Sequence, residues 1–442
     1  MTLKQLKIAA LVAAAFAAGG CGILKKGAPK TPVVGERIAV LASESDVAID
    51  PATAALPMAL PAPQVNADWS QSGGNAAKAM GHVALGSSIA QAWQASIGQG
   101  TSLSARLAAS PVVGDGRVYT IDTTATVRGF DAQTGALVWS SRFGVEKGND
   151  AALFGGGLAF ANGRIYATNG LGFVAALDAS NGSAVWQVRP GGPMRGSPTI
   201  AGDALYVMSQ DNQIYSLKTA DGSTNWSEAA ALEIAGVFGV ASPAFAQGTV
   251  VAGFSSGELN AYRYENGRAV WQDALARTSI RTSVSSLSDI DADPVIDSGQ
   301  VIAIGQGGRM VALELITGQR MWELNLAGIA TPWVAGDWVF VVTSDGKLMA
   351  IARATGKVRW ITQLPEFRHS RSKSGLISYT GPVLAGGRLI VASTQGALIF
   401  ADPTTGAVQG QTNVGGSVSL PPVVANSTLY VLDDNGRLRA FR

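Results

Sequence analysis

The sequence predicts an all-β fold, an eight-bladed β-propeller of four-stranded antiparallel blades. Three observations lead to this prediction. Successive tryptophans of the repeat, which leaves out Trp333 and Trp338, lie between 38 (322 to 360) and 51 (271 to 322) residues apart, and β-rich runs divided by turn dipeptides fill each interval. A period of about 40–50 residues with four strands per unit is typical of a propeller. The phrase Gly-x-x-x-Trp occurs six times, ending at Trp139, Trp186, Trp226, Trp271, Trp322 and Trp360.

One copy, residues 336–360, shows how the unit is built. A β-rich run over 338–343 meets the turn Ser-Asp-Gly at 344–346, and a second run covers 347–352. Asp-Gly between two such runs is a strong hairpin signal because glycine accepts positive φ at little cost. After a second turn at 354–356, a third strand carries Trp360.

The unit recurs along the chain and predicts how the ring closes. The seventh copy has Gly410 where tryptophan is expected, and the eighth stops before its last strand. The segment 87–98, with Trp93, supplies a strand of the same kind, so we expect this N-terminal strand to pair with the C-terminal blade and protect its edge. The copies cover 116–139, 163–186, 202–226, 248–271, 299–322, 336–360, 386–410 and 427–441.

The tryptophans are interpreted as structural. The glycine permits the turn before the outer strand, and the indole then packs against the neighbouring blade rather than forming a platform for a ligand. The predicted blade tryptophans are Trp93, Trp139, Trp186, Trp226, Trp271, Trp322 and Trp360.

The first 20 residues read as a secretory signal peptide. Lys4 and Lys7 precede an apolar run over 8–18, and Gly19 and Gly20 stand before Cys21. This run is too short to cross a bilayer of about 30 Å. We therefore expect residues 1–20 to be removed.

Small residues before the chain's single cysteine resemble a bacterial lipobox, which implies acylation (palmitate among the chains) of Cys21. The alternative is an ordinary signal peptide with an incidental cysteine. The Pro- and Ala-rich residues 21–65 contain no aromatic side chain and are expected to form a mostly extended tether. Residues 66–442 then form the propeller.

Composition argues against several classes of function. The chain carries 33 Lys and Arg against 31 Asp and Glu, without a basic block of the kind that follows phosphates, so we expect no nucleic-acid partner. With one cysteine and only His82 and His369, a zinc or haem site has few ligands to draw on. No catalytic residue and no cofactor site is predicted.

The phrase G-x-[LV]-x-A-[LF]-[DK]-x-x-x-G-x-x-x-W resembles the PQQ-like repeat, which occurs in quinoprotein dehydrogenases and in the BamB family of lipoproteins. Many of the enzymes stack the quinone on adjacent cysteines and need an aspartate beside a metal, whereas this chain has Cys21 alone. The resemblance therefore favours the BamB family, whose members are scaffolds rather than enzymes. A quinoprotein and an envelope sensor propeller remain the alternatives.

The resemblance also implies a partner site. The stretch 285–296, "SSLSDIDADPVI", is similar to a family segment L-S-D-x-D-x-x-P that contacts a POTRA domain of BamA, which places Leu287, Asp289 and Asp291 at the contact. The preceding loop places Val237 and Phe238 there, with Phe238 where the family has arginine. From the residues alone, two aspartates near a proline also make a simple turn.

Taken further, the resemblance implies a place in the cell. The protein would be anchored by lipid to the outer membrane, with Gly22 consistent with that membrane, and would face the periplasm. There it would join BamA and the other components of the BAM complex and assist folding and insertion of outer-membrane proteins. Nascent outer-membrane proteins are a further partner, through pairing of their strands with a blade edge.

Overall fold

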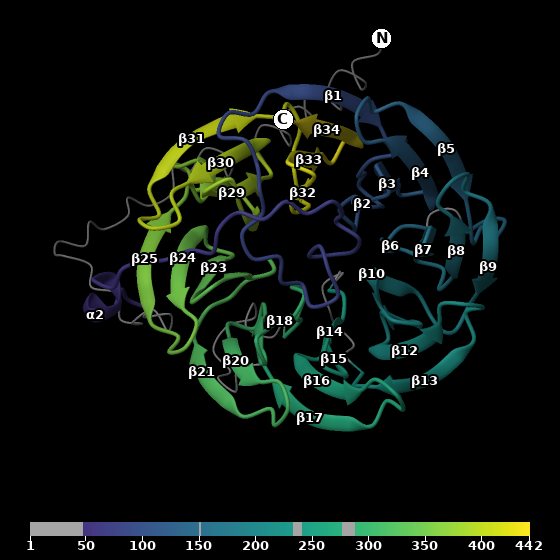
Figure 1. The fold of residues 1–442 in the computed structure, drawn as a ribbon, viewed down its shortest axis with the longest axis horizontal. Helices are drawn as coiled ribbons and strands as arrows, with labels where there is room; N and C mark the ends of the chain where they lie inside the picture. The colour runs from purple at the N-terminus through teal and green to yellow at the C-terminus, as the bar shows by residue number, and fades with distance from the viewer. Residues whose placement is uncertain (1–46, 150–151, 233–240, 276–287) are drawn as a thin grey trace, which may run out of the picture. The chain divides into compact units, whose positions relative to one another are not determined.

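The computed structural model describes residues 47–149, 152–232, 241–275 and 288–442. They form eight four-stranded antiparallel sheets around a common axis, as predicted (Figure 1). The helix among these residues is the single turn α2 (Pro51–Ala54). In blades 1 to 7 the strands follow one another from the axis to the rim, because each pairs with the next in sequence.

Blades 1 to 4 consist of β2 (Val112–Gly114), β3 (Arg117–Ile121), β4 (Thr126–Asp131) and β5 (Leu137–Arg142); β6 (Leu158–Ala161), β7 (Arg164–Thr168), β8 (Val174–Asp178) and β9 (Ala184–Val188); β10 (Met194–Ala201), β11 (Ala204–Ser209), β12 (Gln213–Lys218) and β13 (Thr224–Ala229); and β14 (Ala244–Ala246), β15 (Thr249–Gly253), β16 (Glu258–Arg263) and β17 (Ala269–Ala274). Blades 5 to 7 consist of β18 (Val295–Asp297), β19 (Gln300–Ile304), β20 (Met310–Glu314) and β21 (Arg320–Leu324); β22 (Trp333–Ala335), β23 (Trp338–Val342), β24 (Lys347–Ala352) and β25 (Val358–Gln363); and β28 (Tyr379–Ala385), β29 (Arg388–Ser393), β30 (Ala397–Ala401) and β31 (Val408–Asn413). Blade 8 consists of β32 (Val423–Ala425), β33 (Thr428–Leu432), β34 (Arg437–Phe441) and β1 (Gln91–Ser96), and the small hairpin β26 (Phe367–His369) and β27 (Ser374–Leu376) lies between blades 6 and 7.

The ring closes between the two ends of the propeller sequence. Strand β1 pairs antiparallel with β34, with Trp93 opposite Ala440 and Ser96 opposite Arg437. The predicted closure is confirmed, and blade 8 gains its outer strand from residues that precede blade 1 (Figure 1).

The tryptophan and glycine of one Gly-x-x-x-Trp phrase serve two different interfaces. Each of the seven tryptophans donates its indole N–H to a carbonyl in the following blade, over 2.7–3.1 Å. That carbonyl lies three residues before the glycine of the next phrase, so the indole rests on this glycine. A Cβ built on Gly182 would lie 2.4 Å from Cε3 of Trp139, which shows that only glycine fits beneath the ring.

Gly410 replaces tryptophan because blade 8 has no turn to receive one. Its outer strand arrives by pairing rather than through a hairpin, so no Gly-containing turn faces blade 7. Instead, Arg388 of β29 donates hydrogen bonds to the carbonyls of Gly86 and Ser87, over 2.7 and 2.5 Å, just before β1. Cation–π contact of Arg388 with Phe400 completes this interface.

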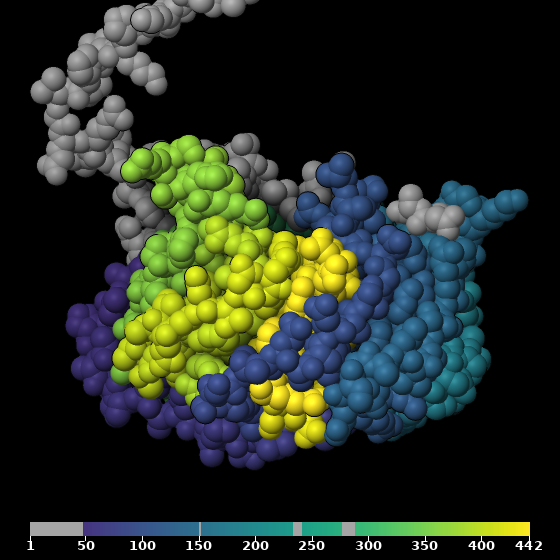
Figure 2. All heavy atoms as spheres, turned by 90° about the horizontal axis from the view of Figure 1, so that it is seen from above, coloured from purple at the N-terminus to yellow at the C-terminus, as the bar shows by residue number. Residues whose placement is uncertain are grey.

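The strand directions define two faces. We call the face that carries the connections from each outer strand to the next inner strand the connection face; these connections run over 97–111, 143–157, 189–193, 230–243, 275–294, 325–332, 364–378 and 414–422. The hairpin β26–β27 belongs to this face and projects from it (light green, top of Figure 2). The opposite face carries the turns between the first and second strands, and we call it the turn face.

Residues 66–85, which we call the plug, bind the inner strands of all eight blades in ring order. Trp69 exchanges two backbone hydrogen bonds with Val113 of β2. At the end of β28, the Val83 N–H donates to the Leu384 carbonyl, and the Val83 carbonyl accepts from the Gly386 N–H. The remaining contacts come from Asn66 to β32, Ser70 to β6, Gln71 to β10, Ala76 to β14, Ala77 to β18 and Gly81 to β22. Apart from the bond to β22, which the Trp333 indole donates, these bonds reach the turn-face ends of the strands, so the plug covers that end of the axis (Figure 1).

Part of the predicted tether also lies against the propeller. The backbone N–H of Asp50 donates to Val358 of β25 over 2.9 Å, and the Arg359 guanidinium donates to the carbonyls of Thr53 and Leu56. His82 lies 2.7 Å from the Pro61 carbonyl through Nδ1. The segment that packs on the propeller therefore begins before residue 66. Hydrogen bonds to its main chain hold it there, and such bonds leave no regular pattern of hydrophobic residues in the sequence.

Candidate functional site

Four of the predicted site residues lie outside the described residues. Cys21 falls within 1–46, Val237 and Phe238 fall within 233–240, and Leu287 falls within 276–287. The latter two ranges belong to connections on the connection face, before and after blade 4. The described part of the site is therefore the segment 288–294 with the residues that it contacts.

Asp289 and Asp291 were expected to meet a partner at the surface, and the structure places both inside. Asp289 is fully buried, and Asp291 is 8% exposed. Ile290 between them is buried against Gly253 of blade 4, and its N–H donates to the Phe254 carbonyl. Both carboxylates therefore lie beneath the surface, where this segment folds back between blades 4 and 5, and their contact with a partner stays a prediction.

Among the described residues, the guanidinium of Arg195, on β10 of blade 3, lies close to Asp291. This group is buried, donates to Ser255 Oγ over 2.6 Å and to the Ile290 carbonyl over 3.1 Å, and lies 3.9 Å from Asp291 Oδ1. One arginine thus ties blade 3, blade 4 and the segment before blade 5 together. It fixes the root of the connection that contains Leu287.

Burial dominates the electrostatics of this cluster. It raises the pKa of Asp291 to about 6, although Arg195 partly offsets the effect, and nearby Asp289 raises it further. Burial also lowers the pKa of Arg195, against the pull of both carboxylates. Asp291 is therefore held as a carboxylate at neutral pH at a cost in free energy.

Asp293 and Lys78 form a second pair of buried charged residues. Asp293 accepts from the Ser242 N–H over 2.7 Å and from Ser72 Oγ of the plug over 2.5 Å. Lys78 of the plug is 2% exposed and donates to Thr199 Oγ1 over 3.0 Å. Burial lowers the pKa of Lys78 to about 8, and the Asp293 charge opposes this shift.

Asp291 and Asp293 line a pocket of about 350 Å³ on the propeller axis. Ser72 of the plug also lines it, which places the plug at its inner end. Connections of blades 8, 5 and 6 supply the other walls, including Leu107, Ile329 and Leu420. Of the two predicted aspartates, Asp291 thus lines a cavity.

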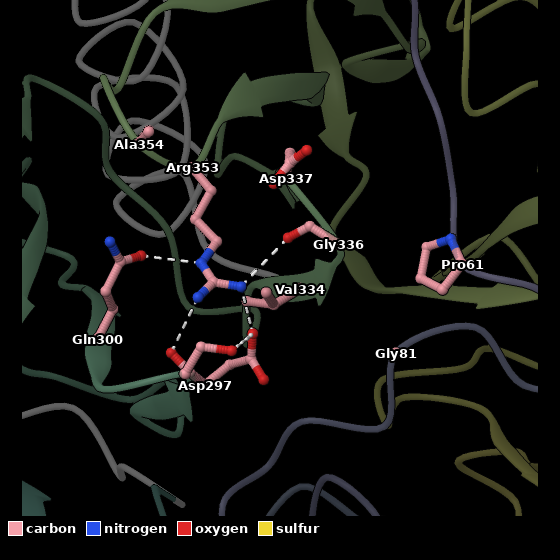
Figure 3. A pocket seen from close by; sticks show the side chains of 10 residues that line it. Pro61, Gly81, Asp297, Gln300, Val334, Gly336, Asp337, Arg353 and Ala354 are labelled. Atoms are coloured by element: carbon pink, nitrogen blue, oxygen red, sulfur yellow. Dashed lines mark hydrogen bonds and ion pairs between the residues drawn. The ribbon is translucent and has the colours of Figure 1, made fainter.

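The turn face carries a larger pocket, of about 600 Å³, between blades 5 and 6 (Figure 3). Arg353 is its central cation, and its guanidinium donates to Gln300 Oε1 over 2.8 Å, to the Gly336 carbonyl over 3.2 Å, and to both the carboxylate and the carbonyl of Asp297. Four bonds leave one N–H of the five for anything else. This arginine is committed to joining two blades.

Within 47–149, 152–232, 241–275 and 288–442, no group of three or more His, Cys, Asp or Glu side chains is arranged to hold a metal ion. In the same part of the chain, no helix has the length and apolar character needed to cross a membrane.

Sequence reasoning did not find Arg195, Lys78 or the plug. Arg195 stands in "GGPMRGSPTI", where a charged residue inside an otherwise buried run is the one available signal. Its partners lie 60 and 95 residues away, so no local spacing could connect them.

Comparison with known proteins places the chain among outer-membrane assembly factors. The family profile described as "Outer membrane protein assembly factor BamB" matches residues 123–362 and 367–442. The protein of that name from Yersinia pestis is 25% identical over 331 residues, covering 73% of this chain and 81% of its own length. The one from Salmonella typhimurium is 28% identical over 377 residues, covering 75% and 83%.

Solved structures share the fold. The crystal structure of BamB from Moraxella catarrhalis superposes with a TM-score of 0.66 at 19% identity, over 80% of this chain and 100% of that one. A quinohemoprotein alcohol dehydrogenase from Comamonas testosteroni has the same TM-score at 13% identity, over 85% and 80%. At these identities the likeness shows the fold alone.

Proposed function

Because this chain belongs to the family of the outer membrane protein assembly factor BamB, we propose that it acts as a non-catalytic scaffold of the β-barrel assembly machinery. The match of the family profile across seven of the eight predicted repeats carries this proposal. The scaffold would be held at the outer membrane by lipid on Cys21 and would face the periplasm.

The partner proposed for the scaffold is the POTRA region of BamA, bound at the connection face. The predicted contact residues Val237, Phe238 and Leu287 lie in connections of this face, on either side of blade 4. Asp289 and Asp291, predicted at the same contact, are buried at the root of the second connection, where Arg195 lies 3.9 Å from Asp291 and donates to the Ile290 carbonyl. Such recognition depends on a few anchors and on shape more than on total area.

A binding experiment tests the proposal. The full-length chain in a non-ionic detergent is titrated with the purified POTRA region of BamA from the same organism. We expect wild type to bind and Leu287→Glu or Phe238→Glu to weaken binding at least tenfold, because a charge replaces an apolar anchor. Leu137→Glu is the matched control, since Leu137 is a leucine 56% exposed on an outer strand.

The outcomes separate the site from the function. Binding by wild type that neither Leu287→Glu nor Phe238→Glu changes would move the contact to another face. Absence of binding by folded wild type would refute the scaffold proposal. Circular dichroism of each variant shows that the propeller is retained.

A further inference from the structure

The axial pocket is built from parts of the chain that lie far apart in sequence. Its walls come from the connections of several blades, and the plug residue Ser72 lies at its inner end. Because the plug hydrogen-bonds to every inner strand, this end of the axis is covered by main chain. Any ligand of the pocket therefore approaches from the connection face.

Two acceptor oxygens of the pocket have no donor among the described residues. Asp291 Oδ1 accepts no hydrogen bond, and its side chain is only 7% exposed to water. Nη2 of Arg195 lies 3.9 Å from this oxygen. Gln306 Oε1, in the blade 5 turn beside it, is also without a donor. Buried acceptors of this kind are normally satisfied, because an unmade bond costs free energy.

The two carboxylates that line the pocket differ in their hydrogen bonds. Asp293 is the better satisfied of the two pocket carboxylates, since it accepts from Ser72 and Ser242. The acceptor without a hydrogen bond therefore lies on the Asp291 side of the pocket.

Three aliphatic side chains are among those that line the pocket. Leu107 and Leu420 are buried and belong to the blade 8 connections, and Ile329, 45% exposed, belongs to the connection between blades 5 and 6. Arg106, which also lines the pocket, is exposed and positively charged. A cation is therefore attracted by the buried carboxylate of Asp291 and not by the pocket entrance. An apolar stem with a charged end suits such a site.

We propose that the axial pocket binds a guanidinium group on an aliphatic stem, which donates N–H bonds to Asp291 Oδ1 and Gln306 Oε1. A guanidinium presents several donors in one plane and no acceptor, so it fits two neighbouring oxygens without placing an acceptor against them. The stem packs against Leu107, Leu420 and Ile329. The group comes either from an arginine side chain of a partner protein or from a free small cation.

The probe that tests this site is N-ethylguanidinium, and N-ethylurea is its uncharged counterpart of the same shape. Each is titrated into the full-length chain in a non-ionic detergent and observed by saturation-transfer NMR of the ligand. We expect the guanidinium to bind and the urea to bind at least tenfold more weakly. The measurement uses no partner protein, so it succeeds or fails independently of the scaffold proposal.

Variants locate the binding. We expect Asp291→Asn to weaken N-ethylguanidinium at least tenfold, and Gln306→Leu to weaken it several-fold. Gln306 is partly exposed, and its backbone N–H, which donates to the Asp289 carbonyl, is unaffected by the substitution, so this variant tests the site even if Asp291→Asn fails to fold. Asp337→Asn, which removes an exposed carboxylate on the turn face, is the control and leaves the affinity unchanged.

Equal binding of the urea and the guanidinium, or full binding by both Asp291→Asn and Gln306→Leu, overturns the proposal. When the site is established, the POTRA region of BamA is added to the complex. Displacement of N-ethylguanidinium assigns the natural ligand to an arginine of that partner. Retention assigns it to a free cation.

Discussion

The carbonyl oxygen of Ala179 accepts a hydrogen bond of 2.9 Å from the indole N–H of Trp139, which belongs to the preceding blade. The same ring lies on Gly182, three residues further along. Seven of the eight blade interfaces repeat this pair of contacts. The stability of the ring therefore depends on a feature that two neighbouring repeats share, and single substitutions can test it.

Gly182→Ala should destabilise the protein more than Gly163→Ala. Both glycines have positive φ, +76° and +70°, so alanine costs about 1–2 kcal/mol of backbone strain at either. Only at Gly182 does the new Cβ meet an indole, and this overpacking adds about 1–3 kcal/mol. Equilibrium urea unfolding measures both variants; equal losses would show that the indole yields without cost.

Trp69→Ala should release the plug. Trp69 is 3% exposed, stacks on Trp333 with ring centroids 6.0 Å apart, and pairs with β2 through its backbone. We expect a loss of about 3–5 kcal/mol in the free energy of unfolding. Leu137→Ala, at an exposed position, should stay within about 0.5 kcal/mol. Limited proteolysis would show cleavage within 66–85 in the tryptophan variant first; cleavage elsewhere first would contradict this role for the plug.

Asp291→Asn should change how stability depends on pH. The carboxyl has a pKa near 6 in the folded protein against 3.8 without the fold, so the folded state binds the proton more tightly. Its contribution to stability is present below about pH 4 and is lost as the pH rises through 6, an effect of about 2–3 kcal/mol.

Asparagine removes this loss. The variant should therefore gain stability relative to wild type between pH 4.5 and 7.5, as measured by urea unfolding at each pH. A difference between the two proteins that does not vary with pH would mean that Asp291 keeps an ordinary pKa.

Lys78→Met should affect the alkaline side. Burial lowers the pKa of Lys78 from 10.5 to about 8, so the folded protein releases this proton before the unfolded chain does. Wild-type stability should rise between pH 8 and 10 because of this group, by up to about 3 kcal/mol. Methionine cannot titrate, and its curve should lack the rise. Parallel curves for the two proteins would argue against a neutralised lysine.

The repeat was predictable because its signals are local. The distance from Gly182 to Trp186 is set by one turn and half a strand, and it recurs in every complete copy, so period and turn chemistry together define the blades. Even the exception at Gly410 follows the rule, since blade 8 lacks the turn that would receive an indole.

The buried site was not predictable in the same way. Asp289 and Asp291 have the spacing and neighbours of a surface turn, and their burial depends on Arg195, which lies near neither in sequence. The plug has no period to detect, because it bonds mostly through its backbone to eight strands spread from 112 to 425. Long-range contacts made by main chain leave little trace in side-chain patterns.

The shared construction of blade 8 has a consequence for the order of folding. Blades 1 to 7 form from adjacent hairpins, whereas β1 and β34 are joined across almost the whole propeller sequence. Closing a loop of this length is slow, because its entropy cost precedes any gain from the contact. Pairing of these two strands is therefore the last step, and until residues 437–441 are available both edges stay open to other chains. The time between synthesis and closure is the interval in which this protein most needs protection from aggregation.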